Sequence, residues 1–533
     1  MPAEPVARDA AILSVSDRSG IVGLALALAT HHVALYATGG TRSYLAEHGV
    51  EARDVGELTG FPPLFDGRVK TLHPYLFGAI MADRDNPAHE RERAQLGLPR
   101  VRLVVVNLYP FEATVARDGA TFDEAIEQID IGGVALIRAA AKNFAHVTVL
   151  VDPEQYALVE AAPLDVDLGV RRRLATRAFG RTAEYDGAIV RYLEAGMLAH
   201  ELPGSLALTL PLRQQLRYGE NPQSRAAFYL SRTEQLPEQL GGKALSYNNL
   251  LDLDATLRLL LRAPVAPLDG EPGESGFAPY ECGRAEVVRA AIVKHTVPCG
   301  VAERSTSRDA VRCALDADPI SAYGGIIALD GRADLATADA LAEFFLEIVA
   351  APEFDDDALA RLRKKKNLRV LRYDRRLVPH LAEELRVRSA LGGVLAENDD
   401  PDAAPERWRV VSRRQPQADQ WRDLAFAWDI VRHVKSNGVV IVRDAVTRGI
   451  CAGQTNRVSA IRIAGLRAGE FAAGSACASD GFFPFPDGLE VAAESGCAAV
   501  IAPQGSIRDA EVIEAANRLG IALVFSTYRY FLH

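Results

Sequence analysis

Lys294 and His295 stand side by side at the end of an apolar run, in the segment AIVKHTVPCGVA of residues 291–302. An apolar run that ends in two ionisable residues and a Pro-Cys-Gly turn is typical of a buried strand that opens into a site. A histidine exchanges protons near neutral pH, and a neighbouring lysine can hold or donate one. The pair predicts acid–base chemistry, although a solvated lysine beside a core histidine would give the same pattern.

Two strand-to-helix junctions near the start of the chain carry hydroxyl and glycine residues. Their candidate ligand-binding residues are Ser14, Ser16, Arg18, Thr38, Gly39, Gly40 and Thr41. Free N–H groups at a helix N-terminus attract a phosphate, because the helix dipole is positive there. The two junctions together predict a phosphate cradle; turns that only join two elements are the alternative.

A third group of candidate residues lies in the loop-like segment that follows. Arg68, Lys70 and Thr71 lie with His73 in a segment that has no regular apolar period. Two cations spaced in this way between turn residues suit an anionic substrate, whereas a solvated basic loop is the plain alternative.

Asn107 and Tyr109 end the strongly apolar run VRLVVVNLYPF. Ligands bind at the carboxyl ends of strands in open α/β sheets, so both residues are candidates for a site. Tyr109 could equally be a core tyrosine.

A helix is predicted after the Gly132-Gly133 turn, with Arg138 and Lys142 as i, i+4 neighbours on its polar side. Two such cations repel each other unless an anion lies near them. Asp130, just before the turn, could supply the counter-charge or act as a base. A solvated helix face explains the same spacing.

The elements that carry these groups fall into two regions. Residues 171–195 predict one long amphipathic helix that leads out of the first region, and the Pro-Gly pair in ELPGSL marks a boundary. We therefore expect domains at residues 1–203 and 204–533. Residues 263–283, rich in Pro, Gly and acidic residues, predict a loop insertion. The cation run RLRKKKNLRV indicates a solvated turn, with contact to a polyanionic ligand as the alternative.

Composition limits the classes of function. The 533 residues suggest two to four domains, and the net charge of −10 does not favour nucleic-acid binding. There is no apolar run of about 18 residues and no apolar N-terminal stretch, so we expect a cytoplasmic protein without membrane contact. The cysteines lack C-x-x-C or Cys/His spacing, which indicates reduced thiols rather than disulfides or zinc.

The chain contains, in this order, the motifs SVSDRSG, ATGGT, GRVKTLHP, NLYPF, IDIGGVALIRAAAKN, LRYGENPQ, ALSYNNLLDLDA, AIVKHTVPCG, DPISAYGGIIA, VKSNGVVIV, ICAGQTNR, ASDGFFPFPD and YRYFLH. Together they resemble the AICAR transformylase/IMP cyclohydrolase family of purine biosynthesis. The resemblance implies an α/β protein, in which a doubly wound methylglyoxal-synthase-like domain precedes tandem cytidine-deaminase-like units. It also implies a homodimer that uses 10-formyltetrahydrofolate as co-substrate, with no tightly bound cofactor and no metal.

For formyl transfer to AICAR, which gives FAICAR, the resemblance implies that His295 takes the amine proton. Lys294 delivers a proton, and Asn437 orients the histidine. The substrate-binding residues implied for this site are Arg217, Tyr218, Asn248, Tyr323, Glu347, Arg457 and Arg529, with Phe482 and Pro484 flanking the folate ring.

For ring closure of FAICAR to IMP, the resemblance implies that Lys70 stabilises the oxyanion. Tyr109, Asp130 and Lys142 form the proton-transfer group. The residues implied to hold the nucleotide are Ser14, Ser16, Arg18, Thr38, Gly39, Gly40, Thr41, Arg68, Thr71 and Asn107.

The chain departs from the family pattern at a few positions. Val297 replaces an asparagine, Tyr323 a phenylalanine, Thr455-Asn456 a Met-Ser pair, and Arg18 a common lysine. Two rival functions are a zinc-type nucleotide deaminase and a non-catalytic effector-binding module. The missing P-C-x-x-C ligands speak against the first, and the reactive side chains of the first domain would be unnecessary for the second.

Overall fold

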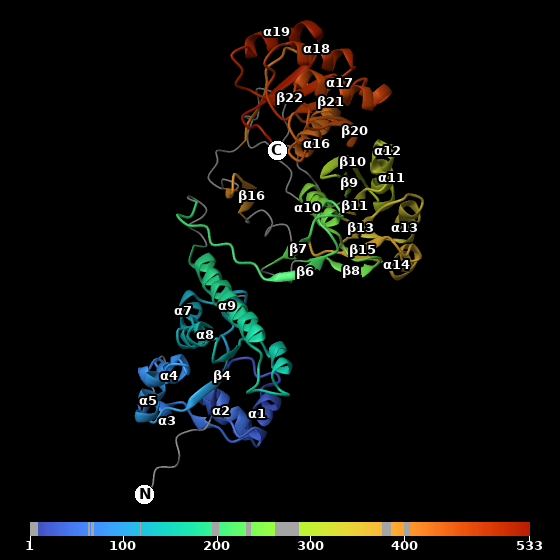
Figure 1. Ribbon diagram of the computed structural model, residues 1–533. Coiled ribbons are helices and arrows are strands. Elements are labelled where there is room, and N and C mark those ends of the chain that lie inside the picture. The colour runs from blue at the N-terminus through green and yellow to red at the C-terminus, as the bar shows by residue number, and fades with distance from the viewer. Residues whose placement is uncertain are drawn as a thin grey trace. The chain divides into compact units, whose positions relative to one another are not determined.

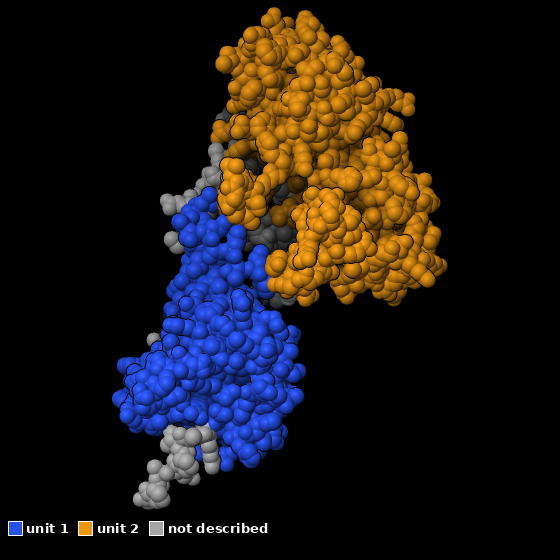
Figure 2. Space-filling view, in the orientation of Figure 1, with its two compact units in different colours: residues 1–211 blue, residues 212–533 orange. Residues whose placement is uncertain are grey.

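The computed structural model describes residues 9–61, 64–65, 69–117, 119–194, 202–230, 236–261, 287–375, 385–398 and 406–533. Arg68 and the predicted insertion at residues 263–283 lie outside these ranges. The chain divides into two compact units between Pro211 and Leu212, a few residues beyond the predicted boundary (Figure 1, Figure 2). Among the described helices, none is both long and apolar enough to cross a membrane.

The first unit is built on a sheet of five parallel strands in the order β3-β2-β1-β4-β5. The strands are β1 (Asp9–Val15), β2 (Ala34–Ala37), β3 (Arg53–Asp54), β4 (Arg100–Asn107) and β5 (Thr148–Leu150). The helices are α1 (Ile21–Thr30), α2 (Gly39–Glu47), α3 (Gly56–Thr59), α4 (Pro74–Met81), α5 (Pro87–Gln95), α6 (Phe111–Val115), α7 (Phe122–Glu127), α8 (Gly132–Lys142), η2 (Pro153–Leu158) and α9 (Leu168–Glu194).

Helices cover both faces of this sheet. Ile12 of β1 belongs to a core with α4 and α8, while its neighbour Leu13 belongs to a core with α1. Alternate residues of a strand point to opposite faces, so a strand covered on both sides reads as a continuous apolar run. The predicted doubly wound domain is confirmed. Because the strands are parallel, the loops after β1, β2 and β4 meet at one edge.

The second unit is built on a sheet of twelve strands. Its first half contains β8 (Glu238–Gly241), β9 (Val288–Lys294), β10 (Val297–Arg304), β11 (Ile326–Leu329), β13 (Ile348–Ala351) and β15 (Arg369–Arg372). Its second half contains β18 (Trp408–Val410), β19 (Val439–Arg443), β20 (Val446–Cys451), β21 (Ala476–Ser479), β22 (Ala499–Pro503) and β23 (Ala522–Ser526).

The remaining elements of this unit are helices and three small sheets. The helices are α10 (Tyr247–Leu261), α11 (Ser307–Ala317), α12 (Pro319–Ala322), α13 (Leu335–Ala342), α14 (Asp356–Arg363), α16 (Ala418–Val431), α17 (Arg457–Ala468), η4 (Gly469–Ala472), α18 (Asp487–Glu494) and α19 (Asp509–Leu519). The small sheets pair β6 (Leu212–Leu216) with β7 (Ala226–Tyr229), β12 (Arg332–Ala333) with β14 (Glu353–Phe354), and β16 (Arg386–Ala390) with β17 (Gly393–Glu397).

The two halves of the large sheet repeat one topology. The strand order β10-β9-β11-β13-β15-β8 recurs as β20-β19-β21-β22-β23-β18. In each half an antiparallel hairpin precedes three parallel strands. A Cβ on Gly300 would overlap the carbonyl oxygen of Ala314, and a Cβ on Gly449 would overlap that of Ala464. The same close approach of helix to strand therefore occurs twice. Helices α10 and α16 share one core on one face of the sheet.

Candidate active sites

At the carboxyl edge of the first sheet, Asn107 ties the loop after β1 to the end of β4. Its Oδ1 accepts hydrogen bonds from the backbone nitrogens of Ser16 (2.6 Å) and Asp17 (2.9 Å), and its Nδ2 donates to the carbonyl oxygen of Asp17 (2.8 Å). Three hydrogen bonds from one side chain fix the course of this loop. Asn107 thus holds the backbone of the loop that carries the predicted phosphate-binding residues.

Hydroxyl groups join β1 to the start of α2. Thr41 Oγ1 accepts from the backbone nitrogen of Val15 (2.9 Å), and Thr38 Oγ1 donates to Ser14 Oγ (3.1 Å). Helix α2 begins at Gly39 with no side-chain cap, so its first N–H groups are free for a ligand. A Cβ on Gly40 would lie 3.5 Å from Nη2 of Arg18, which places the guanidinium beside this helix start. This edge of the first sheet therefore combines the N-terminus of α2 with the Arg18 guanidinium, and both attract an anion.

A second cluster forms before α8. Asp130 Oδ1 accepts a hydrogen bond of 2.7 Å from the backbone nitrogen of Gly133. Burial raises the pKa of Asp130, while the N–H groups of Gly133 and Tyr109 and the charge of Lys70 act in the opposite direction. A Cβ on Gly132 would overlap Thr71 Oγ1, so this turn packs directly against Thr71. The structure brings Lys70, Thr71, Tyr109 and Asp130 together.

Lys142 does not join this cluster within the chain. It is the last residue of α8, whereas Asp130 precedes the first turn. At 1.5 Å of rise per residue, the helix separates the two by about 15 Å. Lys142 and Arg138 are both exposed, as the predicted polar face requires, and Arg138 lies over the Phe179 ring at 5.5 Å. The role of Lys142 in ring closure stays a prediction that its position does not support.

In the second unit, Lys294 and His295 lie at the tip of the β9–β10 hairpin. Lys294 pairs with Val297 across a two-residue turn, in which His295 and Thr296 have φ values of 55° and 61°. Lys294 Nζ donates to the carbonyl oxygen of Tyr323 (2.7 Å). The His295 side chain is exposed, and its ring makes no hydrogen bond within the described part of the chain. Tyr323 thus contributes its backbone carbonyl group, which a phenylalanine at this position would also supply.

The start of α10 collects the other predicted residues of the first half. Asn248 Nδ2 donates to the carbonyl oxygen of Glu220 (3.3 Å), in the loop between β6 and β7 that also carries Arg217 and Tyr218. Arg217 Nη2 donates to the hydroxyl of Tyr218 (2.7 Å).

Asn249, next to Asn248, is not among the predicted site residues. Its Nδ2 donates to Glu347 Oε2 (2.9 Å), which also accepts from Arg369 Nη1 (3.2 Å).

The second half contributes Arg457 and Asp480 to the edge of the sheet where β21 ends. Arg457 Nη1 donates to Asp480 Oδ1 and to Ser479 Oγ, both at 2.6 Å. Ser436 Oγ donates to Asp480 Oδ2 (2.6 Å). Asp480 was not among the predicted residues, although its place after an apolar run in ASDGFFPFPD could have suggested it. The buried carboxylate fixes the direction of the guanidinium.

Asn456 explains one departure from the family pattern. It caps α17, because its Oδ1 accepts from the backbone nitrogen of Ser459 (2.8 Å). Serine and asparagine are both good N-cap residues, so the exchange keeps the start of the helix that carries Arg457.

The segment that carries Arg529 is anchored by buried partners. The Tyr530 hydroxyl donates to Glu406 Oε2 (2.7 Å), and the backbone nitrogen of Ser436 donates to the carbonyl oxygen of Leu532 (2.9 Å). Arg529 itself is exposed and lies over the Phe531 ring at 4.7 Å. Phe482 is half-buried and Pro484 is exposed.

The expected contact between Asn437 and His295 is not formed. Asn437 Nδ2 donates to the carbonyl oxygen of Gln454 (2.8 Å) instead. The order β9-β10-β20-β19 places two strands between them, which corresponds to about 14 Å at 4.8 Å per strand. Both residues nevertheless belong to one edge, because β10 and β20 are antiparallel, with Ala302 opposite Val446. Asn437 and the His295 ring thus form no hydrogen bond within the described residues, and the orienting role of Asn437 stays a prediction.

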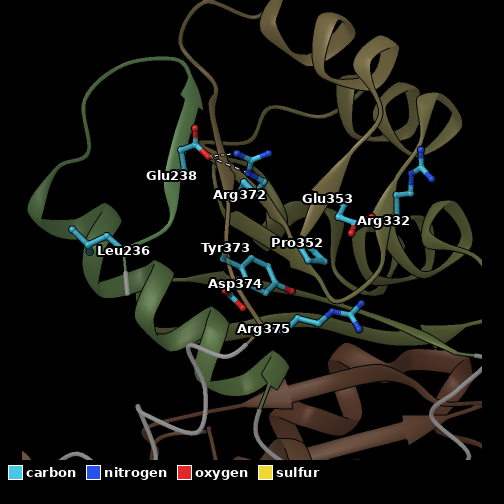
Figure 3. A pocket seen from close by; sticks show the side chains of 9 residues that line it. All are labelled: Leu236, Glu238, Arg332, Pro352, Glu353, Arg372, Tyr373, Asp374 and Arg375. Carbon is cyan, nitrogen blue, oxygen red and sulfur yellow. Dashed lines mark hydrogen bonds and ion pairs between the residues drawn. The ribbon is translucent and has the colours of Figure 1, made fainter. Parts of the chain in front are cut away.

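A cavity of about 640 Å³ lies at the opposite edge of the sheet, where β13 and β15 end (Figure 3). Two of the arginines that line it are paired with carboxylates. Arg372 bonds to Glu238, as the dashed lines in Figure 3 show, and Arg332 bonds to Asp355. Because β11 runs antiparallel to β9, with Ile326 opposite Val293, this cavity is at the far edge from His295. It is separate from the predicted transferase residues.

A zinc site of the deaminase type is not formed at the β9–β10 hairpin. Across the described ranges, the only group of three potential metal ligands is Asp83, Asp85 and His146, in the first unit. The Cys299 thiol instead faces the carbonyl oxygen of Val297 at 3.8 Å. A structural or catalytic zinc needs at least three ligands from the protein, and the described residues at the β9–β10 hairpin do not supply them.

Comparison with known proteins gives two family matches. Residues 20–135 match the MGS-like domain, and residues 140–467 match the AICARFT/IMPCHase bienzyme. The bifunctional purine biosynthesis protein PurH of Desulfitobacterium hafniense is 44% identical over 98% of this chain and 99% of its own length. PurH of Parasynechococcus marenigrum is 46% identical over 98% and 99%. A solved structure titled "Crystal structure of ForH" is 35% identical and covers 35% of this chain and 99% of its own, with a TM-score of 0.31.

Proposed function

The chain belongs to the AICARFT/IMPCHase bienzyme family, and from this premise we propose how its two units divide the two activities. The protein is a bifunctional enzyme of purine biosynthesis. It transfers a formyl group from 10-formyltetrahydrofolate to AICAR and closes the product, FAICAR, to IMP with loss of water. In our proposal residues 1–211 carry ring closure and residues 212–533 carry formyl transfer. Family membership favours this function over a zinc deaminase or an effector-binding module.

The contact that carries the ring-closure site is the hydrogen bond of 2.7 Å from the backbone nitrogen of Gly133, which holds the Asp130 carboxylate beside Lys70. Burial raises the pKa of this carboxylate. Ring closure requires the carboxamide nitrogen to attack the formyl carbon and to lose a proton, while negative charge develops on the formyl oxygen. A buried carboxylate with a raised pKa is a stronger base than an exposed one. We assign Asp130 to that proton and the Lys70 ammonium to the oxyanion. Tyr109 protonates this oxygen to a hydroxyl group, which leaves as water with the proton that Asp130 has taken up. The nitrogen that carried the formyl group loses its N–H proton, which restores the Tyr109 hydroxyl, so the protons balance.

The cradle at the same edge holds the substrate. Ser14, Ser16 and Thr38 offer hydroxyl groups, and Arg18 offers a guanidinium beside the free N–H groups of α2. In this proposal the ribose phosphate of FAICAR lies there and its base points toward Asp130. Asn107 and Thr41 act by holding the loops rather than by touching the phosphate. Arg68 remains part of the prediction and lies outside the described residues.

For formyl transfer, the weakly nucleophilic 5-amino group of AICAR needs a base. His295, exposed at the hairpin tip, takes the amine proton as nitrogen attacks the formyl carbon. Lys294, held by the Tyr323 carbonyl group, delivers a proton to the leaving nitrogen of tetrahydrofolate. Atoms balance, because the amine loses one proton and the folate gains one.

The other predicted residues bind the two substrates of the transfer. Arg217, Tyr218, Asn248, Glu347, Arg457 and Arg529 are assigned to AICAR, and Phe482 and Pro484 to the folate ring. Folate is a co-substrate in this account, and neither a metal nor a tightly bound cofactor takes part in a step. A homodimer in the cytoplasm is proposed from the family resemblance.

Mixing two variants tests the division of activities. His295→Ala should lack transfer and Asp130→Ala should lack ring closure, so each alone should fail to make IMP from AICAR. An equimolar mixture should make IMP, because FAICAR released by one variant can be closed by the other. A mixture as inactive as its parts would show that the assigned residues serve one common site.

A further inference from the structure

We propose that Asp252 is a positioning residue for formyl transfer, acting through the backbone turn that carries His295. This inference rests on the role proposed above for His295. Asp252 lies on α10, and its Oδ1 accepts a hydrogen bond from the backbone nitrogen of Thr296 (2.6 Å). Its Oδ2 accepts from the backbone nitrogen of His295 (3.3 Å). One carboxylate therefore binds both N–H groups at the tip of the hairpin.

This turn needs a partner because of its residue types. A two-residue turn with both φ values positive is usually made by asparagine, aspartate or glycine. Here the positions are filled by His295 (φ 55°) and the β-branched Thr296 (φ 61°), for which a positive φ is unfavourable. A charged acceptor forms stronger hydrogen bonds than a neutral one. The Asp252 carboxylate thus favours a backbone conformation that the β-branched Thr296 disfavours.

The position of the His295 ring depends on this backbone. Lys294 is tied separately, through its Nζ, to the carbonyl oxygen of Tyr323. The His295 ring makes no hydrogen bond in the described ranges, so no such bond would hold it if the turn relaxed. A misplacement of about 1 Å at a reacting group can lower a rate about 100-fold.

The internal repeat supplies a matched control. In the second half, Asp423 of α16 accepts from the backbone nitrogens of Asp444 (2.7 Å) and Ala445 (2.8 Å). Those two residues have φ values of 57° and 51° at the tip of the β19–β20 hairpin. The same carboxylate-to-turn contact thus occurs at a hairpin tip to which no reactive role is assigned.

The experiment compares Asp252→Ala with Asp423→Ala in the full-length protein. We measure Tm, and kcat and KM for AICAR in formyl transfer, together with ring closure of supplied FAICAR. Asp252→Ala should lower kcat for transfer about 10- to 100-fold with little change in KM. Asp252→Asn keeps one acceptor oxygen and should recover part of that loss. Asp423→Ala should lower Tm and leave kcat for transfer at the parental value. Ring closure should be unchanged in all of them.

Two results would overturn the positioning role. One is a parental kcat in both Asp252 variants; the other is an equal loss of kcat in Asp252→Ala and Asp423→Ala. If Asp252→Ala does not fold, the isosteric Asp252→Asn decides, with a loss of kcat expected. His295→Ala distinguishes the positioning role of Asp252 from the proposed role of His295 on which it rests. A parental transfer rate in His295→Ala would refute the role of His295 itself, whereas loss there with none in the Asp252 variants would refute only the positioning role.

Discussion

The Asp130 carboxylate accepts a 2.7 Å hydrogen bond from the backbone nitrogen of Gly133, and a Cβ on Gly133 would overlap Asp130 Oδ2. The glycine is required here because the carboxylate occupies the space that a side chain would fill. This contact holds a half-buried carboxyl group at the start of α8, next to Lys70 and Tyr109.

Burial of Asp130 predicts a cost in stability at neutral pH. Its pKa is raised in the folded protein, so the folded state holds this proton more tightly than the unfolded state. The stability that this group contributes is present below the unfolded pKa of about 3.9 and is lost as pH rises through the raised folded value. Asp130→Asn should therefore raise Tm at pH 7 while it slows ring closure, and the difference in Tm should vanish near pH 3.

Glu90→Gln is the control for that measurement. Hydrogen bonds from Arg93 and Arg100 lower the pKa of Glu90, so its contribution has the opposite sign. This variant should lower Tm at pH 7, and the difference should shrink as the pH falls through the lowered folded pKa. A lower Tm at pH 7 in Asp130→Asn would contradict the cost assigned to its burial.

Asn107→Ala should weaken binding of FAICAR. The change removes three hydrogen bonds that hold the loop after β1, so KM for ring closure should rise and stability should fall by about 1–3 kcal/mol. Asn143 of the same unit donates to the carbonyl oxygens of Ile80 (2.7 Å) and Ala82 (3.1 Å), remote from the cradle. Asn143→Ala should cost similar stability with KM unchanged. Equal KM values in the two variants would remove Asn107 from the cradle.

The buried pair of Arg457 and Asp480 predicts a strong dependence of each on the other. Asp480 is fully buried, so Arg457→Met leaves a carboxylate without its guanidinium and should destabilise by about 3–5 kcal/mol in chemical denaturation. Adding Asp480→Asn should restore most of that stability but not the KM for AICAR. Arg312→Met, which breaks an exposed pair with Glu343, should change stability little. A double variant that recovers AICAR binding would exclude Arg457 as a ligand of the nucleotide.

Much of the fold could be predicted from local patterns. The apolar runs at β4 and β9 and the periodicity of α8 and α9 are local signals, and both are present in the structure. Candidate residues at strand ends followed from the same runs. Partners distant in sequence could not be found in this way, because Asp252 binds a turn 44 residues away and Asn249 binds Glu347. Side-chain spacing placed Arg138 and Lys142 on one helix face, but the length of α8 separates Lys142 from Asp130.

The two activities are assigned to two separate sites in one chain, and His295→Ala tests this assignment directly. In one preparation of the folded variant, we measure the initial rate of formyl transfer to AICAR and the initial rate of ring closure of supplied FAICAR. We expect transfer to fall by roughly 10²–10⁴-fold, the usual contribution of a positioned general base, with ring closure at the parental rate. Loss of both initial rates would contradict the account and require a single shared site.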